Sequence, residues 1–139
     1  MWNRLEAATW QVKVRLEGYV EKGVGQASQR MAASSEVFER AMGERLYPGT
    51  LNVRIKRKVP LREHFRIYGK ETGDPNQDLL VEVCRINGIL GYRICPYYVD
   101  SGLGGHGEDV LEIACSQRIP NVTYGSRVVV GLFWEDSES

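Results

Sequence analysis

The chain has 139 residues, the length of one domain, and its 18 basic residues balance 18 acidic residues to a net charge of zero. A general binder of nucleic acid or of membrane surfaces would carry a basic excess, so neither partner is expected. Apolar residues at 42% and charged residues at 26% are typical of a globular protein rather than a disordered one.

No part of the sequence predicts a membrane helix, because the longest apolar run, residues 128–134, is far shorter than the ~20 residues a span requires. The N-terminal residues lack the apolar core of a secretory signal. The three cysteines, Cys84, Cys95 and Cys115, are scattered and form no Cys-x-x-Cys pair. This favours reduced thiols in a cytoplasmic protein and argues against a zinc site.

Alternating apolar and polar residues predict a first strand over residues 12–20, followed by a glycine-bearing loop over 21–28. A helix is then expected from Ser34 and Ser35, which can cap it, to Gly43, which can end it. Its apolar residues share one face.

Pro48-Gly49 is typical of a type II turn and leads into a strand over 50–55, which the charged run Lys56-Arg57-Lys58 is expected to close. Residues 69–78 are polar and predict a loop, and residues 101–107 form a glycine-rich loop. Four later strands are predicted, at residues 79–86, 89–98, 110–115 and 127–134.

These patterns predict a mainly β protein: a small six-stranded β-barrel with one short inserted helix. We expect one domain over residues 1–139, with a core from about 12 to 134. Strands and helices do not alternate, so a parallel Rossmann-type sheet is not expected. The stretch Thr50-Leu51-Asn52-Val53 resembles Val110-Leu111-Glu112-Ile113, which would place Asn52 and Glu112 at equivalent positions of two half-barrels; chance also explains so short a match.

Thr50 and Asn52 stand two apart in a predicted strand, so their side chains point to the same face. Together they would present two neutral oxygens of the kind that Mg²⁺ accepts when phosphates complete its shell. Thr-x-Asn is common, and two outward polar residues of an ordinary strand are the more frequent explanation.

Four further features could contribute to a site. Gly23-Val24-Gly25 follows a predicted strand and could bring backbone N–H groups to a phosphate, although a hairpin turn gives the same pattern. Glu112 could take a proton from a hydroxyl if its face of the strand lines a pocket, or be a surface charge. His106 could carry a proton or contact phosphate, or be solvated. The basic residues Arg54 and 56–58 could attract phosphates, or guard a strand edge.

The order of these pieces resembles the CTP-dependent riboflavin kinases of archaea. The resemblance covers roughly residues 14–134, and its most specific parts are Pro48-Gly49-Thr50-Leu51-Asn52-Val53 and Asp109-Val110-Leu111-Glu112-Ile113-Ala114. It implies a cradle-loop β-barrel and Mg²⁺-dependent phosphoryl transfer from CTP to the 5′-hydroxyl of riboflavin, giving FMN and CDP.

The resemblance also implies roles for individual residues. Thr50 and Asn52 match Mg²⁺ ligands, and Glu112 matches a flavin-contacting glutamate, which we also nominate as general base. The nucleotide loop corresponds to Gly23, Val24, Gly25, Gln26, Ala27 and Ser28. A second nucleotide contact corresponds to Gln117, Arg118, Ile119 and Pro120.

The sequence departs from the family at three places. Ala27 and Ser28 stand where the family usually has glycine and a basic or bulky residue. Gly104 replaces a flavin-contacting threonine, and Tyr124-Gly125-Ser126 replaces a frequent Asp-Gly-Asp.

These departures leave three alternatives: a relative that phosphorylates another small hydroxylated metabolite, a non-catalytic nucleotide- or flavin-binding module, and a nucleic-acid-binding barrel. Zero net charge argues against the last. The sequence does not determine the oligomeric state, and a monomer is compatible with it.

Overall fold

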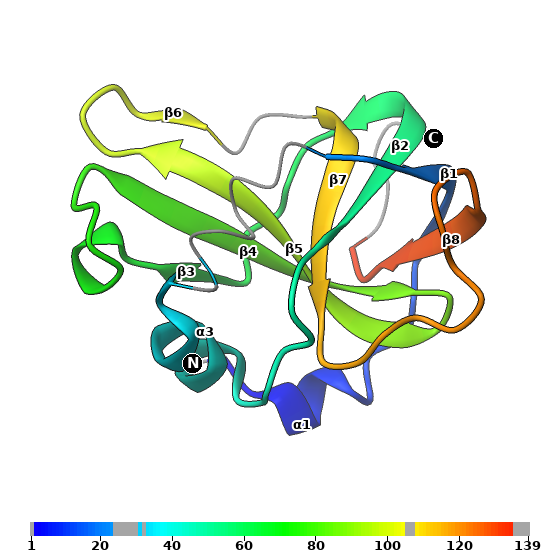
Figure 1. Cartoon of the computed structure of the whole chain (residues 1–139), viewed down its shortest axis with the longest axis horizontal. Coiled ribbons are helices and arrows are strands. Elements are labelled where there is room, and N and C mark those ends of the chain that lie inside the picture. Colours follow the sequence, from blue (N-terminus) through cyan, green and yellow to red (C-terminus); the bar gives the residue numbers. More distant parts are fainter. Residues whose placement is uncertain (1, 24–30, 32, 105–107, 135–139) are drawn as a thin grey trace.

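The computed structural model describes residues 2–23, 31, 33–104 and 108–134. Six antiparallel strands in it close into a barrel, because the last strand of the ring pairs again with the first (Figure 1). This confirms the predicted six-stranded barrel. In ring order the strands are β4 (Gln77–Ile86), β8 (Arg127–Leu132), β1 (Val14–Glu21), β2 (Leu51–Val59), β7 (Glu108–Cys115) and β5 (Ile89–Tyr98).

Two shorter strands extend the sheet, and neither was expected from the sequence. The three-residue β3 (Phe65–Ile67) pairs with β4, and the two-residue β6 (Leu103–Gly104) pairs with the end of β5. Segments this short carry almost no alternation, so the sequence pattern does not reveal them.

The predicted helix is present as α3 (Ser35–Met42). Gly43 follows it in the left-handed conformation, with φ of 80°, and its N–H donates to the carbonyl of Glu39 at 2.8 Å. A residue without a Cβ adopts this conformation without strain, which is why the helix ends there. The chain also begins with a short helix, α1 (Arg4–Ala7), capped by the side chain of Asn3.

Several predicted strand ends differ by one or two residues: β1 begins at Val14, β7 begins at Glu108 and β8 ends at Leu132. Two larger differences concern charged and polar segments. The basic residues 56–58 do not close a strand, because β2 continues through them to the buried Val59. The predicted loop over 69–78 contains a 3₁₀ turn, η1 (Gly69–Glu71), and gives its last two residues to β4. The segment is ordered because the buried carboxylate of Asp78 accepts a hydrogen bond from the Gly69 N–H at 2.8 Å, which fixes the 3₁₀ turn.

The apolar residues form two cores on opposite sides of the sheet. The first lies inside the barrel and contains inward residues such as Leu16, Val53, Leu111 and Val130. The second lies outside β4, β5 and β7 and is covered by the N-terminal residues, α3 and β3. Its members include the fully buried Ala7, so residues before the predicted start of the core at about 12 also pack on the barrel.

A buried ion pair stands among the inward residues of β4 and β5. Glu82 and Arg93 are register partners, 0% and 2% exposed, and Arg93 Nη1 donates to Glu82 Oε1 at 3.2 Å. Arg93 Nη2 also donates to the Val59 carbonyl at 2.6 Å, and the Trp134 indole N–H donates to Glu82. Burial raises the pKa of Glu82, and the charge of Arg93 opposes that rise. Removing one partner of such a buried pair costs about 3–5 kcal/mol. Because Arg93 also binds the carbonyl of Val59, the pair holds the chain in place where it leaves β2.

Candidate functional site

The turn before β2 brings the Thr50 region beside the end of β7. Gly49 has φ of 92°, as the predicted Pro48-Gly49 type II turn requires. The Tyr47 N–H donates to the Cys115 carbonyl at 2.7 Å, which ties the turn to the last residue of β7. As a result, β2 starts at a fixed position against β7.

Thr50, Asn52 and Glu112 come together on the outer face of the barrel. Asn52 of β2 lies directly opposite Glu112 of β7, and Thr50 Oγ1 donates to Glu112 Oε2 at 2.6 Å. All three side chains are half-buried, whereas Val53 and Leu111 beside them point into the barrel core. The two candidate metal ligands and the candidate base therefore form one polar cluster.

Gly23 packs against this cluster from the end of β1. A Cβ placed on Gly23 would lie 2.1 Å from Asn52 Nδ2, so no larger residue fits without moving the amide. The backbone of the predicted phosphate loop thus begins in contact with Asn52. The rest of that loop, Val24, Gly25, Gln26, Ala27 and Ser28, lies outside the described residues, as does His106.

Arg54 forms ion pairs with acidic side chains of the two neighbouring strands. Its guanidinium donates to Glu21 at 2.8 and 3.0 Å and to Asp109 at 3.1 Å. These exposed ion pairs add little stability, but they engage the Arg54 charge and bridge β1 to β7 across β2.

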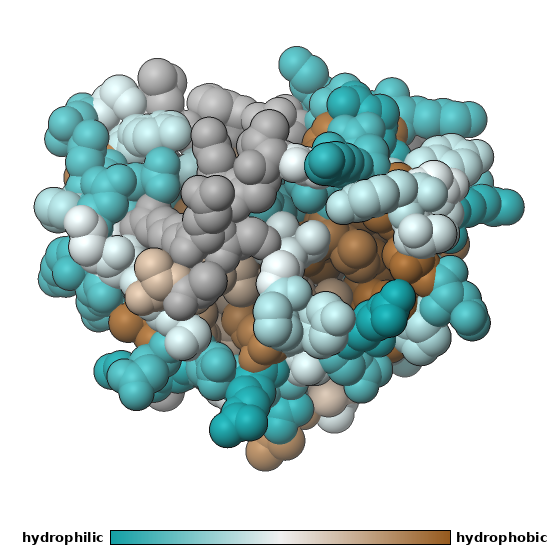
Figure 2. Space-filling model, in the orientation of Figure 1, coloured by the Kyte–Doolittle hydropathy of each residue, from teal (hydrophilic) through white to brown (hydrophobic). Residues whose placement is uncertain are grey.

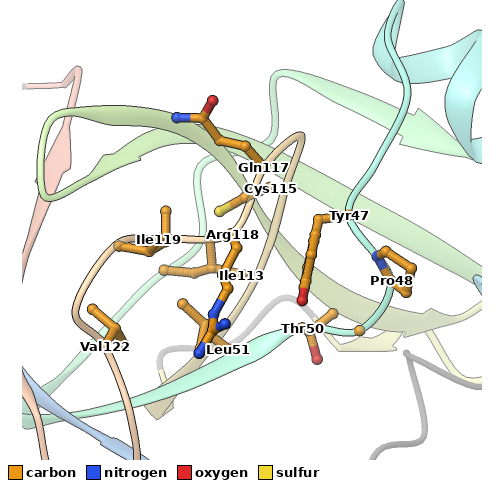
Figure 3. Close-up of a pocket in the computed structure, with 11 residues that line it drawn as sticks. Tyr47, Pro48, Thr50, Leu51, Ile113, Cys115, Gln117, Arg118, Ile119 and Val122 are labelled. Atoms are coloured by element: carbon orange, nitrogen blue, oxygen red, sulfur yellow. The ribbon is translucent and has the colours of Figure 1, made fainter.

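A pocket of about 140 Å³ opens between this turn and the segment after β7. Figure 3 shows Tyr47 and Thr50 on one side of it, Ile119 and Val122 on the other, and the Arg118 guanidinium between them. On the molecular face of Figure 2, apolar side chains lie open in a hollow bordered by hydrophilic ones. Such a mixture of apolar wall and few polar groups is typical of a small-molecule site. The volume is below the ~300–1,000 Å³ of sites that enclose a drug-sized ligand, so this pocket can hold only part of one.

The residues of the predicted nucleotide contact, 117–120, line two neighbouring hollows. Gln117, Arg118 and Ile119 line the pocket with Thr50, whereas Pro120 lines a shallower hollow beside it. The Ile119 side chain is only 3% exposed and belongs to the barrel core. This segment can therefore offer a ligand the side chains of Gln117 and Arg118, while Ile119 anchors it.

A second hollow, of about 160 Å³, lies around the Gly23 contact. Thr50, Asn52 and Gly23 line it together with the exposed Tyr124. The predicted flavin-side residue Gly104 lies elsewhere, in β6, opposite Tyr97 near the end of β5. The structure therefore joins Thr50, Asn52, Glu112, Gly23 and residues 117–119, and leaves Gly104 apart from them.

The cysteine in the pocket wall is poorly placed to act as a nucleophile. Burial raises the pKa of Cys115 to about 12, with the Glu44 carboxylate adding to the rise. Burial also raises the pKa of Cys84 well above its ordinary value. Since the thiolate is the form that attacks or binds metals, these raised pKa values disfavour both roles at neutral pH.

The oxygen donors of the cluster fit a hard cation. Within the described ranges, no group of three or more His, Cys, Asp or Glu side chains gathers to hold a metal. Thr50 and Asn52 instead offer a hydroxyl and an amide oxygen on one face. Both are neutral oxygen donors, so the donor set suits Mg²⁺ with phosphate ligands.

Comparison with known proteins gives no family: no protein-family model matches the chain, and no curated protein matches it in sequence. Among the helices in the described part of the chain, none has the length and apolar character needed to cross a membrane.

Two tyrosines line the site although no site role was predicted for either of them from the sequence. Tyr47 and Tyr124 are 46% and 67% exposed and line the two hollows. Each precedes a turn glycine, Gly49 and Gly125, which is the one local signal that could have placed them at turns. Nothing local shows that both turns meet at Thr50.

Proposed function

We propose that this protein is a CTP-dependent kinase of a small hydroxylated metabolite, with riboflavin as the acceptor. The observation that carries the proposal is the convergence of Thr50 and Asn52 with Glu112, which lies about sixty residues further along the chain, in one cluster against Gly23. Phosphoryl transfer relies mainly on positioning and charge neutralisation, and this cluster offers groups for both.

Each residue has a separate task in this proposal. Thr50 and Asn52 would hold a Mg²⁺ ion, which when bound neutralises the charge of the nucleotide phosphates. The backbone at Gly23 starts the segment whose N–H groups bind phosphate oxygens. Arg118, at the rim of the pocket beside Thr50, adds a positive charge for the nucleotide.

Glu112 orients the acceptor hydroxyl and takes its proton. The hydroxyl oxygen bonds to the γ-phosphorus of CTP, the bond from that phosphorus to the bridging oxygen breaks, and CDP leaves with the electron pair. The proton passes to the Glu112 carboxylate. The hydrogen bond from Thr50 holds this carboxylate in place before the acceptor arrives.

An aromatic acceptor is supported by a further hollow of about 220 Å³ between α3 and the turn before β2. Its apolar wall includes Met31, Phe38 and Leu46, and it shares Tyr47 with the pocket beside Thr50. A flat apolar ring can bury its surface here, with gain roughly proportional to the apolar area removed from water.

The test is an assay of the purified protein with Mg²⁺ and riboflavin, supplied with CTP or with ATP, followed by separation of flavins and nucleotides. FMN and CDP in equal amounts, made with CTP, would support the proposal. Consumption of CTP only with another hydroxylated metabolite would retain the kinase and replace the acceptor. Tight CTP binding with no phosphorylated product from any acceptor would favour a binding module instead.

A further inference from the structure

Tyr124 is the most exposed of the large hydrophobic side chains near the candidate site. Its side chain is 67% exposed although it stands among the residues that line the hollow with Gly23, Thr50 and Asn52. A single exposed aromatic residue needs no explanation on an ordinary surface. Tyr124, however, lies at the rim of a polar hollow, where a ligand could contact its ring.

The backbone that carries Tyr124 is held firmly. Tyr124 and Gly125 are the two central residues of a tight turn, in which the Ser126 N–H donates to the Thr123 carbonyl at 3.0 Å and the Thr123 N–H donates to Ser126 Oγ at 2.9 Å. Gly125 has φ of 89°, which this turn requires of its third residue.

The turn is also fixed to the end of β1. The Gly125 N–H donates to the Val20 carbonyl at 2.7 Å, and the Val20 N–H donates to the Ser126 carbonyl at 2.9 Å. Val20 lies three residues before Gly23. The same strand end therefore positions both the start of the phosphate loop and the Tyr124 ring.

The size of the hollow determines which part of a nucleotide meets the ring. Its volume of about 160 Å³ is below the ~300–1,000 Å³ of sites that enclose a drug-sized ligand. Phosphates bound near Gly23 and Asn52 would fill it, so the nucleoside must extend across the rim. A shallower hollow is lined by residues of the segment 118–123, which directly precedes Tyr124 in the chain.

We propose that Tyr124 stacks on the base of the donor nucleotide, and this inference rests on the nucleotide-binding role proposed above. The phenol ring is neutral, so it offers a flat face to a base rather than charge to a phosphate. Stacking on an aromatic side chain tolerates different bases, so Tyr124 contributes affinity for the nucleoside while other contacts select cytosine. The fixed turn lowers the ordering cost of the contact.

The test compares two ligands by calorimetry in the presence of Mg²⁺: CTP, and inorganic tripolyphosphate, which lacks the base. We expect Tyr124→Ala to weaken CTP binding about tenfold, while its affinity for tripolyphosphate stays that of the wild type. Tyr124→Phe keeps the ring and should bind both like the wild type. Tyr68→Ala removes a comparably exposed tyrosine, 50% exposed and next to η1, and should change neither affinity.

Unchanged CTP affinity in Tyr124→Ala would overturn the inference. So would equal weakening of CTP and tripolyphosphate, because that result would mean that the substitution distorts the phosphate site. If the wild type binds CTP without transferring phosphate, the proposed kinase fails and the Tyr124 comparison still decides the stacking. If the wild type binds no CTP, both proposals fail.

Discussion

The hydroxyl of Thr50 donates a hydrogen bond of 2.6 Å to Glu112 Oε2, although the two residues lie 62 positions apart in the sequence. This contact joins the start of β2 to the middle of β7, where Asn52 and Glu112 are register partners. It links the side chains proposed to hold Mg²⁺ with the carboxylate proposed to take the proton.

The double variant Thr50→Ala with Asn52→Ala removes both proposed Mg²⁺ ligands. We expect Mg²⁺-dependent turnover to fall at least about a hundredfold, because phosphate charge is no longer neutralised at the site. Both residues are only half-buried, so circular dichroism should show an intact fold. Thr9→Ala with Asn76→Ala removes the same two side-chain types away from the cluster and should leave turnover unchanged. Full activity of the site variant would refute the metal assignment.

Glu112→Gln tests the proton acceptor. The amide oxygen of glutamine can still accept the hydrogen bond of Thr50, so the local geometry is kept, but an amide does not take the proton. We expect kcat to fall by about 10²–10⁴, with little change in the affinity for CTP. A steady-state comparison of kcat with KM checks this, and an unchanged kcat would leave Glu112 as a structural partner of Thr50.

Gly23→Ala tests the contact between the phosphate loop and the cluster. The added methyl would lie 2.1 Å from Asn52 Nδ2, so it must displace the amide or the loop. We expect this variant to lose activity nearly as far as Asn52→Ala. A double-mutant cycle should show strong coupling, since the second substitution has little left to remove. Additive losses would show that Gly23 and Asn52 act independently.

The strands were largely predictable because alternation is local. Residues 89–98 and the helix over 35–42 follow from periodicity and from Gly43, and the six-stranded barrel follows from their number. The short sequence similarity between residues 50–53 and 110–113 predicted equivalent positions for Asn52 and Glu112 in two half-barrels. The structure makes them direct partners across β2 and β7.

Other features depend on tertiary contacts that the sequence does not encode locally. The covering layer outside the barrel depends on Ala7 and Phe38 meeting the outer face of β4, β5 and β7, far away in sequence. Continuation of β2 through its basic run depends on Val59 reaching the core and on Arg93 binding its carbonyl. The turn that carries Tyr124 is joined to Val20, about a hundred residues earlier in the chain, by two backbone hydrogen bonds.

The buried thiols predict a loss of stability at alkaline pH. The pKa of Cys115 is raised to about 12, and those of Cys84 and Tyr92 are also raised, mainly by burial. Between about pH 9 and pH 12 the unfolded chain therefore releases protons that the folded protein keeps, so the free energy of unfolding falls as pH rises.

Urea unfolding at pH 7.5 and pH 10.5 measures this effect. The midpoint should be lower at pH 10.5, and the difference should shrink in Cys115→Ala, which lacks one of the groups. An equal drop in the variant and the wild type would contradict the role of Cys115, and a midpoint that rises with pH would contradict the assignment of raised pKa values altogether.

The decisive measurement for the proposed kinase is the formation of FMN by the purified wild-type protein, given riboflavin, Mg²⁺ and either CTP or ATP. We expect FMN with CTP and far less with ATP, together with an equal amount of CDP. No FMN with either nucleotide, from protein shown to be folded, would contradict the assignment of riboflavin as the acceptor. It would leave the barrel and the Thr50–Asn52–Glu112 cluster without the proposed reaction.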